Sequence, residues 1–145
     1  MGSLMLPSSG ILYIDTAPII YTVERYSDYE RILLPLWTAV EAGTVEVVTS
    51  ELTMLEALVK PLRDSNYSLA QDYEKFLTAT KFRMLPVTLK TLKNAAQLRA
   101  TANLKTPDAI HAATGIDIGC VQFITNDKDY RRVPSLSVIV LKEII

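Results

Sequence analysis

Short apolar runs alternate with longer segments of helical spacing from residue 11 onwards. Five short runs have the apolar, β-rich character of strands: residues 11–15, 45–49, 82–87, 121–125 and 136–141. Apolar residues recurring at intervals of three and four predict helices between them: residues 18–26, 29–42, 51–60, 68–80, 88–102 and from 106 towards 119. Strands and helices in this order predict parallel strands joined by crossover connections.

This order of elements predicts an α/β fold. We expect a three-layer sandwich in which helices flank a central, mostly parallel sheet of four to five strands. Residues 11–145 are expected to form one domain, and residues 1–10 to be an N-terminal extension or a tag remnant. The sequence contains no internal repeat and no low-complexity tract, so we expect no second domain.

Two of the predicted helices begin with clear capping signals. Ser50 stands directly before the helix at residues 51–60 and is predicted to be its N-cap. Thr106, Pro107 and Asp108 combine a hydroxyl N-cap, a proline at the first helical position and an acid in the first turn. These signals predict the residues at which the two helices begin.

Composition and charge narrow the class of protein. The chain has 145 residues, of which 49% are hydrophobic, as in an ordinary globular protein. Its net charge of −1 argues against a surface coated throughout for nucleic acid, although local basic patches remain compatible with it. No apolar run is long enough to span a bilayer and no signal peptide is evident, so we expect a cytoplasmic protein with no membrane association.

Two acids stand just past the ends of apolar strands. Asp15 follows one strand and Asp127 follows another. The carboxyl ends of parallel strands meet at one edge of a sheet, and neighbouring strands lie about 4.8 Å apart, so both acids could share one metal ion. Asp127 also fits ordinary turn chemistry, whereas Asp15 is harder to explain as a turn residue. A charge placed directly after a buried strand needs compensation.

Glu56 is predicted to face the core. On its helix it shares the i, i+3, i+4, i+7 stripe with Leu52, Leu55 and Val59. Because a buried carboxylate without a partner costs several kcal/mol, we expect Glu56 to have one. The alternative is a glutamate at the edge of the stripe that reaches out to water.

Asp108 has a structural explanation and a functional one. An acid in the first turn of a helix is stabilised by the helix dipole without any further role. However, the small residues Ala109, Ala112 and Ala113 predict that this helix packs closely and holds Asp108 near the edge of the sheet.

Four converging carboxylates would repel one another unless a cation neutralised them. The single cysteine, Cys120, can form neither an internal disulfide nor a thiolate metal site, so an all-oxygen site for Mg²⁺ or Mn²⁺ is expected. His111 is the only histidine, which excludes a two-histidine acid–base ribonuclease mechanism. We expect it to be a satisfied surface or packing residue, with a role beside the site as the alternative.

The sequence resembles the PIN-domain family, particularly the VapC toxins of prokaryotic toxin–antitoxin pairs. The resemblance is carried by four segments in the order ILYIDTAPIIY, SELTMLEAL, TPDAIHAAT and FITNDKDY, and it covers roughly residues 11 to 141. Each segment is weak evidence alone. Together, at these spacings, they are fairly specific.

The resemblance implies a function and a set of site residues. Asp15, Glu56, Asp108 and Asp127 match the family's acidic quartet, which binds Mg²⁺ or Mn²⁺ and cleaves single-stranded or loop RNA. Asp129 is implied as a further ligand or orienting group. Thr16, Thr125 and Asn126 match supporting polar positions. VapC-like proteins commonly form homodimers and are silenced by an antitoxin protein whose tail enters the active-site groove.

Two other functions are compatible with parts of the sequence. A PIN-fold module could bind RNA or a protein partner without cutting. The strand followed by Asp15 also looks like the opening of haloacid-dehalogenase-type phosphatases, in which the aspartate is a nucleophile. That family requires a second acid two residues further on, where this chain has Ala17.

Overall fold

A five-stranded parallel sheet forms the centre of the fold. The computed structural model describes residues 2–79 and 82–145. The strands are β1 (Ile11–Ile14), β2 (Glu46–Ser50), β3 (Arg83–Leu85), β4 (Gln122–Thr125) and β5 (Val138–Val140). Their order across the sheet is β3-β2-β1-β4-β5, and every neighbouring pair is parallel. The predicted α/β architecture is confirmed.

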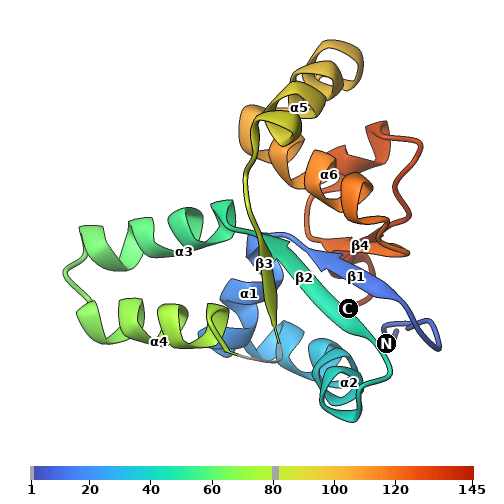
Figure 1. Cartoon of the computed structure of the whole chain (residues 1–145). Helices are drawn as coiled ribbons and strands as arrows, with labels where there is room; N and C mark the ends of the chain where they lie inside the picture. Colours follow the sequence, from blue (N-terminus) through green and yellow to red (C-terminus); the bar gives the residue numbers. More distant parts are fainter. Residues whose placement is uncertain (1, 80–81) are drawn as a thin grey trace.

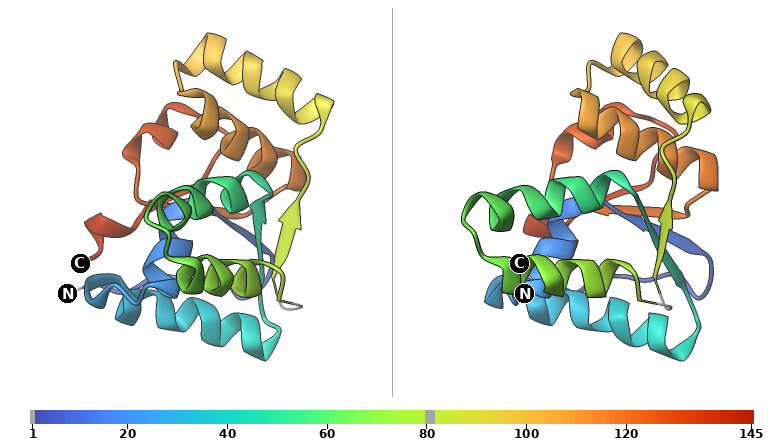
Figure 2. Two further views of the ribbon diagram at one scale, coloured as in Figure 1. Left: turned by 90° about the vertical axis from the view of Figure 1, so that its left-hand side faces the viewer. Right: turned by 60° about the vertical axis from the view of Figure 1, so that its left-hand side comes forward.

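Helices cover both faces of this sheet. The described residues form α1 (Thr16–Val23), α2 (Ser27–Ala42), α3 (Leu52–Arg63), α4 (Tyr67–Leu77), α5 (Leu89–Ala102) and α6 (Thr106–Ile118), with short 3₁₀ turns η1 (Lys128–Arg132) and η2 (Leu141–Glu143). Helices α5 and α6 lie on one side of the strands, and α1, α2 and α4 on the other (Figure 1). Figure 2 shows that the two termini lie side by side, and Gly2 N donates to Ile144 O at 2.9 Å.

The alternation of side chains along β1 creates two cores. Leu12 and Ile14 point into the core shared with α1, α2 and α4, whereas Tyr13 points into the core under α5 and α6. All three are fully buried because β1 is the central strand and has neighbours on both sides.

The register places the ends of β1 and β4 at the same edge. Ile14 pairs with Ile124, so the residues that follow, Asp15 and Thr125, are brought together. The next strand, β2, runs parallel to β1 and ends at the same edge, where α3 begins. The parallel order therefore gathers segments that are far apart in the sequence.

Small residues let α6 approach the sheet closely, as the sequence predicts. Ala109, Ala112 and Ala113 are all buried. Gly115 is tighter still, because a Cβ atom there would lie 3.0 Å from the ring of Phe123 on β4. This close packing fixes the height of α6 above the strands.

Some helix boundaries differ from those predicted. Thr106 is the first residue of α6 rather than its N-cap, a position taken by Lys105; the Thr106 hydroxyl instead accepts from Arg99 Nη1 at 2.8 Å. Ser50 ends β2, and its hydroxyl accepts the amide of Leu52 at 3.0 Å, although the N-cap position itself is Glu51.

Two predicted features reach residues outside the described ranges. The helix expected over residues 68–80 corresponds to α4, but Thr80 lies outside the described residues. Met1, part of the expected extension, does so as well. Within the described ranges no helix is both long and apolar enough to cross a membrane.

A larger side chain at Ala112 is expected to destabilise the fold. Ala112 is fully buried between α6 and the sheet, so Ala112→Leu should lower the free energy of unfolding by about 1–3 kcal/mol in urea denaturation. Ala96→Leu, at an exposed position of α5, is the matched control and should change it by less than about 0.5 kcal/mol. Equal effects of the two substitutions would contradict the packing described here.

Candidate active site

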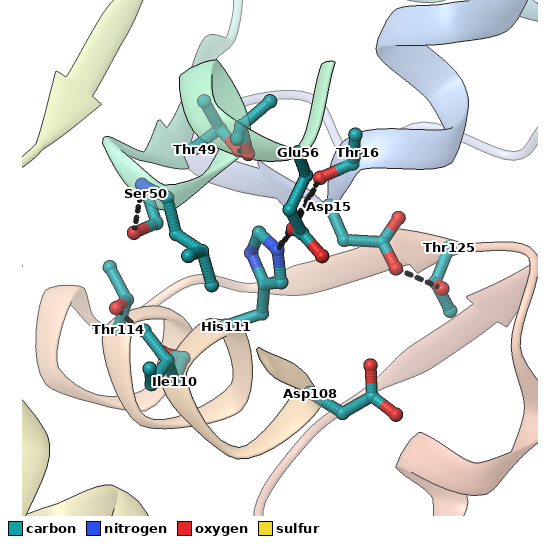
Figure 3. A network of polar contacts seen from close by, with 12 residues as sticks. Asp15, Thr16, Thr49, Ser50, Glu56, Asp108, Ile110, His111, Thr114 and Thr125 are labelled. Carbon is teal, nitrogen blue, oxygen red and sulfur yellow. Dashed lines mark hydrogen bonds and ion pairs between the residues drawn. The ribbon is translucent and has the colours of Figure 1, made fainter. Parts of the chain in front are cut away.

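Asp15 stands at the N-cap position of α1, yet its side chain does not cap the helix. Its carboxylate turns towards β4 instead, where Oδ2 accepts a hydrogen bond from Thr125 Oγ1 at 2.6 Å (Figure 3). An aspartate at this position ordinarily accepts amide hydrogens of the first helical turn. Asp15 is therefore directed to the edge of the sheet rather than used for local structure.

The environment of Asp15 opposes its negative charge. The residue is 8% exposed, and its Oδ1 is buried with no hydrogen-bond partner among the described residues. The pKa of Asp15 is raised to about 6, chiefly by burial. His111 and the Thr125 hydrogen bond partly oppose this rise, and the charges of Asp108 and Glu56 add to it. A buried oxygen without a partner is the kind of atom that a bound cation satisfies.

Asp108 projects from the first turn of α6 into the same region (Figure 3). Its Oδ1 accepts a hydrogen bond from the Tyr130 hydroxyl at 3.3 Å. Partial burial raises the pKa of Asp108, and the charge of Asp127 raises it further. Asp108 is thus electrostatically coupled to Asp15 on one side and to Asp127 on the other.

Asp127 caps the 3₁₀ turn η1. Its Oδ1 accepts the amide of Asp129 at 2.9 Å, and its own amide donates to Thr125 Oγ1 at 3.1 Å. The Thr125 hydroxyl therefore connects Asp127 to Asp15. The Asp129 carboxylate forms an ion pair with Arg132 at 3.4 Å.

The core-facing stripe predicted on α3 is wrong. Leu55 and Val59 are exposed, at 61% and 43%, and the buried residues of α3 are Thr53, Ala57 and Pro61. Glu56 lies beside this buried face and is partly buried. The stripe fails because α3 buries a neighbouring face instead, on which Met54 and Leu58 also pack against the core.

Glu56 nevertheless has the partners that its burial requires. Its Oε1 accepts from Thr16 Oγ1 at 2.7 Å and lies 2.6 Å from His111 Nε2. Burial disfavours the Glu56 carboxylate, but the hydrogen bonds and charge of His111, together with Thr16, outweigh this effect and lower its pKa. Glu56 is thereby held as a carboxylate between α1 and α6.

His111 is a packing residue with partners at both ring nitrogens, as expected, and it also lies beside Glu56, as the alternative held. The residue is 2% exposed, so His111 is not a surface residue. It contacts Glu56 directly. The spacing of three residues from Asp108 was the available signal, since it places both side chains on one side of α6.

The three expected supporting residues differ in what they touch. Thr16 and Thr125 each donate to an acid, Glu56 and Asp15 respectively. Asn126 instead donates to the hydroxyls of Tyr21 and Tyr29, at 2.8 and 3.0 Å, and accepts from the Lys142 amide. Its observed contacts join α1, α2 and η2.

The acids fit a hard divalent cation by their chemistry. All supply oxygen ligands, and Asp15 Oδ1 is buried with no partner in the part of the chain that the structure describes. However, in residues 2–79 and 82–145 no three His, Cys, Asp or Glu side chains are already gathered into a group that could hold a metal ion. Cation binding therefore requires some of these acidic side chains to move closer together.

The chain belongs to the PIN domain family, whose model matches residues 12–136. This assignment leaves the phosphatase alternative without support. A comparison with curated protein sequences finds no significant match.

Solved structures share the fold at low sequence identity. VapBC2 from Rickettsia felis, bound to a DNA fragment from the promoter, matches with a TM-score of 0.71 and 15% identity, covering 90% of this chain and 98% of that one. A toxin–antitoxin complex from Klebsiella pneumoniae gives 0.67 and 21%, covering 90% and 97%. PAE2754 from Pyrobaculum aerophilum gives 0.61 and 13%, covering 93% of each chain.

The buried charge of Asp15 is expected to make the metal-free protein less stable as the pH rises. The folded-state pKa of about 6 exceeds the ordinary 3.8, so the folded chain binds the proton more tightly than the unfolded chain. Ionisation between these values therefore favours unfolding, by on the order of 3 kcal/mol. Urea denaturation with a chelator, at about pH 4 and about pH 7.5, measures this loss.

Two variants isolate the contribution of Asp15. Asp15→Asn should remove most of this pH-dependent loss, whereas Asp72→Asn, at an exposed acid of α4, should retain it. If Asp15→Asn and Asp72→Asn show the same pH dependence, the carboxylate is not disfavoured by the fold.

Proposed function

We propose that this PIN-domain protein is a metal-dependent endoribonuclease that hydrolyses phosphodiester bonds in single-stranded or loop RNA. PIN domains are typically nucleases and usually bind Mg²⁺. The observation that carries the proposal is the buried Asp15 carboxyl. One of its oxygens has no hydrogen-bond partner within residues 2–79 and 82–145, and the charges of Asp108 and Glu56 raise its pKa.

Asp15, Glu56, Asp108 and Asp127 would hold Mg²⁺ or Mn²⁺, with Asp129 as a further ligand or orienting group. When bound, such a cation lowers the pKa of a coordinated water and stabilises charge on a phosphodiester. Two hydroxyl groups of the chain would orient these acids by hydrogen bonds. Thr125 orients Asp15, and Tyr130 donates to Asp108.

A PIN-fold module that binds RNA or a protein without cutting is the competing proposal. The observation that favours it is that, among the described residues, no three metal-binding side chains are already gathered. The two proposals differ in whether RNA is cleaved when a divalent cation is supplied.

We further propose that the protein is the toxin of a toxin–antitoxin pair. Support comes from the fold shared with VapBC2 and with the Klebsiella pneumoniae toxin–antitoxin complex. The helix that carries Glu56 also exposes Leu55, Val59 and Leu62, an apolar surface beside the acids that suits a protein partner. Under this proposal the chain is a cytoplasmic homodimer that an antitoxin inhibits.

Replacing a proposed ligand is expected to abolish cleavage. Asp15→Asn and Asp108→Asn should each lower the rate of Mn²⁺-dependent cleavage of a panel of structured RNAs by about a hundredfold or more, because losing even an outer-shell partner of a metal costs about 10- to 100-fold. Gel analysis of the products measures the rate. Asp72→Asn removes an exposed acid of α4 that is not one of the proposed ligands, so this variant should cleave like the wild type.

Binding of the same RNAs separates the two proposals. RNA that is bound but yields no metal-dependent product with the wild-type protein would favour the non-catalytic module. Products that persist in Asp15→Asn would show that the acids described here do not perform the reaction.

Expression of the protein without a partner is expected to arrest bacterial growth. Asp108→Asn should relieve the arrest because it removes an acid of the proposed site while leaving α6 intact. Growth curves after induction, with immunoblots to equalise expression, provide the measurement. Undiminished toxicity of Asp108→Asn would contradict the proposed site.

A further inference from the structure

His111 has both ring nitrogens engaged in short contacts. Its Nδ1 lies 2.6 Å from the Tyr13 hydroxyl. Its Nε2 lies 2.6 Å from Glu56 Oε1 (Figure 3). The imidazole is almost completely buried on α6. It therefore links the sheet, through Tyr13, to α3, through Glu56.

The chemistry of the partners determines the direction of these hydrogen bonds. A carboxylate can only accept, so His111 Nε2 carries a hydrogen and donates it to Glu56. In the neutral imidazole Nδ1 is then the acceptor, and the Tyr13 hydroxyl donates to it. The donation from Nε2 to Glu56 holds in the protonated ring as well, because both nitrogens then carry hydrogens.

Glu56 depends on this donation because its own helix does not hold it in place. The neighbouring Leu55 is exposed, and the buried face of α3 passes beside Glu56 rather than through it. A glutamate side chain at such a position is free to turn towards water. His111 and Thr16 both bind Oε1, so among the described contacts Oε2 is the oxygen left for another ligand.

The other end of the chain of hydrogen bonds is anchored rigidly. Tyr13 is fully buried on the central strand, and its ring stacks on Phe123 with centroids 4.9 Å apart and planes 8° apart. Tyr13 cannot move without disturbing the core under α6. The imidazole is consequently oriented by the sheet itself.

We propose that His111 is a positioning residue that fixes the Glu56 carboxylate for cation binding and presents only its second oxygen to the ion. Both imidazole nitrogens are occupied, so the ring is not placed to exchange a proton with a substrate. This inference rests on the proposed function in one respect, namely that Glu56 is a ligand of the divalent cation.

Two substitutions at His111 separate the two nitrogens. In His111→Gln the side-chain amide reaches about as far as Nε2 and can still donate to Glu56. In His111→Asn it reaches only about as far as Nδ1, so contact with Tyr13 remains possible but the donor to Glu56 is lost. Thr114→Val is the matched control. Thr114 is also buried on α6, but the hydrogen bond described for its hydroxyl stays within the helix and goes to Ile110 O.

Binding of Mn²⁺ alone, measured by titration calorimetry, is the first readout. His111→Asn should weaken binding by about 10- to 100-fold, the usual effect of losing a residue that orients a metal ligand. His111→Gln should recover a large part of this loss, and Thr114→Val should bind like the wild type. Circular dichroism confirms that each variant is folded. Unchanged Mn²⁺ binding in folded His111→Asn would overturn the proposal.

The second readout needs no metal and no activity. In ¹⁵N–¹H spectra of the metal-free wild-type protein, the His111 ring should show a hydrogen on Nε2 that exchanges slowly with water. Glu56→Ala should expose this hydrogen to exchange, and Tyr13→Phe should shift the Nδ1 resonance. A ring protonated on Nδ1 alone would overturn the proposal even if His111→Asn failed to fold.

The outcomes distinguish this inference from the proposed function. A wild-type protein that binds Mn²⁺ but cleaves no RNA overturns the nuclease proposal, while the His111 variants still decide the positioning role. A wild-type protein that cleaves RNA, with His111→Asn unchanged in Mn²⁺ binding, overturns only the positioning role. A wild-type protein that binds neither Mn²⁺ nor Mg²⁺ overturns both.

Discussion

The parallel pairing of β1 with both β2 and β4 is the constraint on which the site depends. Parallel strands all end at one edge, and the pairing of Ile14 with Ile124 sets Asp15 beside Thr125 across a separation of 110 residues. Helix α1 begins at this edge after β1, and α3 begins there after β2. Helix α6 approaches the same edge from the opposite face of the sheet. A change of one residue in this register would turn Tyr13 and its neighbours to the wrong cores.

Two acids at this edge, Asp15 and Asp108, lie in surroundings that disfavour their negative charge. Burial and the neighbouring acidic charges raise the pKa of Asp15 and of Asp108. Among the residues that the structure describes, only one oxygen of Asp15 finds a hydrogen-bond partner. This arrangement does not stabilise the fold, because an apolar or amide side chain at the same position would cost less free energy to bury. Acids held at such a cost are expected where a site binds a cation. The assignment to the PIN domain family supports this interpretation.

Glu56 has a hydrogen-bond partner, as predicted, although the helical stripe on which that prediction rested is wrong. The apolar spacing of α3 predicted that Leu55 and Val59 would be buried beside it, yet both are exposed. Periodicity identifies a face of a helix but not the surface against which that face packs, and α3 instead buries the face that carries Thr53, Ala57 and Pro61. The need of a half-buried carboxylate for a partner was predictable; that the partner would be His111 was not, because the two residues are 55 positions apart.

The sequence by itself determined the order of strands and helices, the parallel α/β fold and the place of Asp15 just past a strand, because periodicity and turn chemistry act over a few neighbouring residues. The close approach of α6 was equally visible in its alanines. Only the tertiary structure decided the contacts of the site: which oxygen of Asp15 is satisfied, that Thr125 joins it to Asp127, and that His111 connects Tyr13 to Glu56. Such hydrogen bonds depend on distances of a few tenths of an ångström between segments far apart in the chain, and local sequence patterns carry no information about those distances.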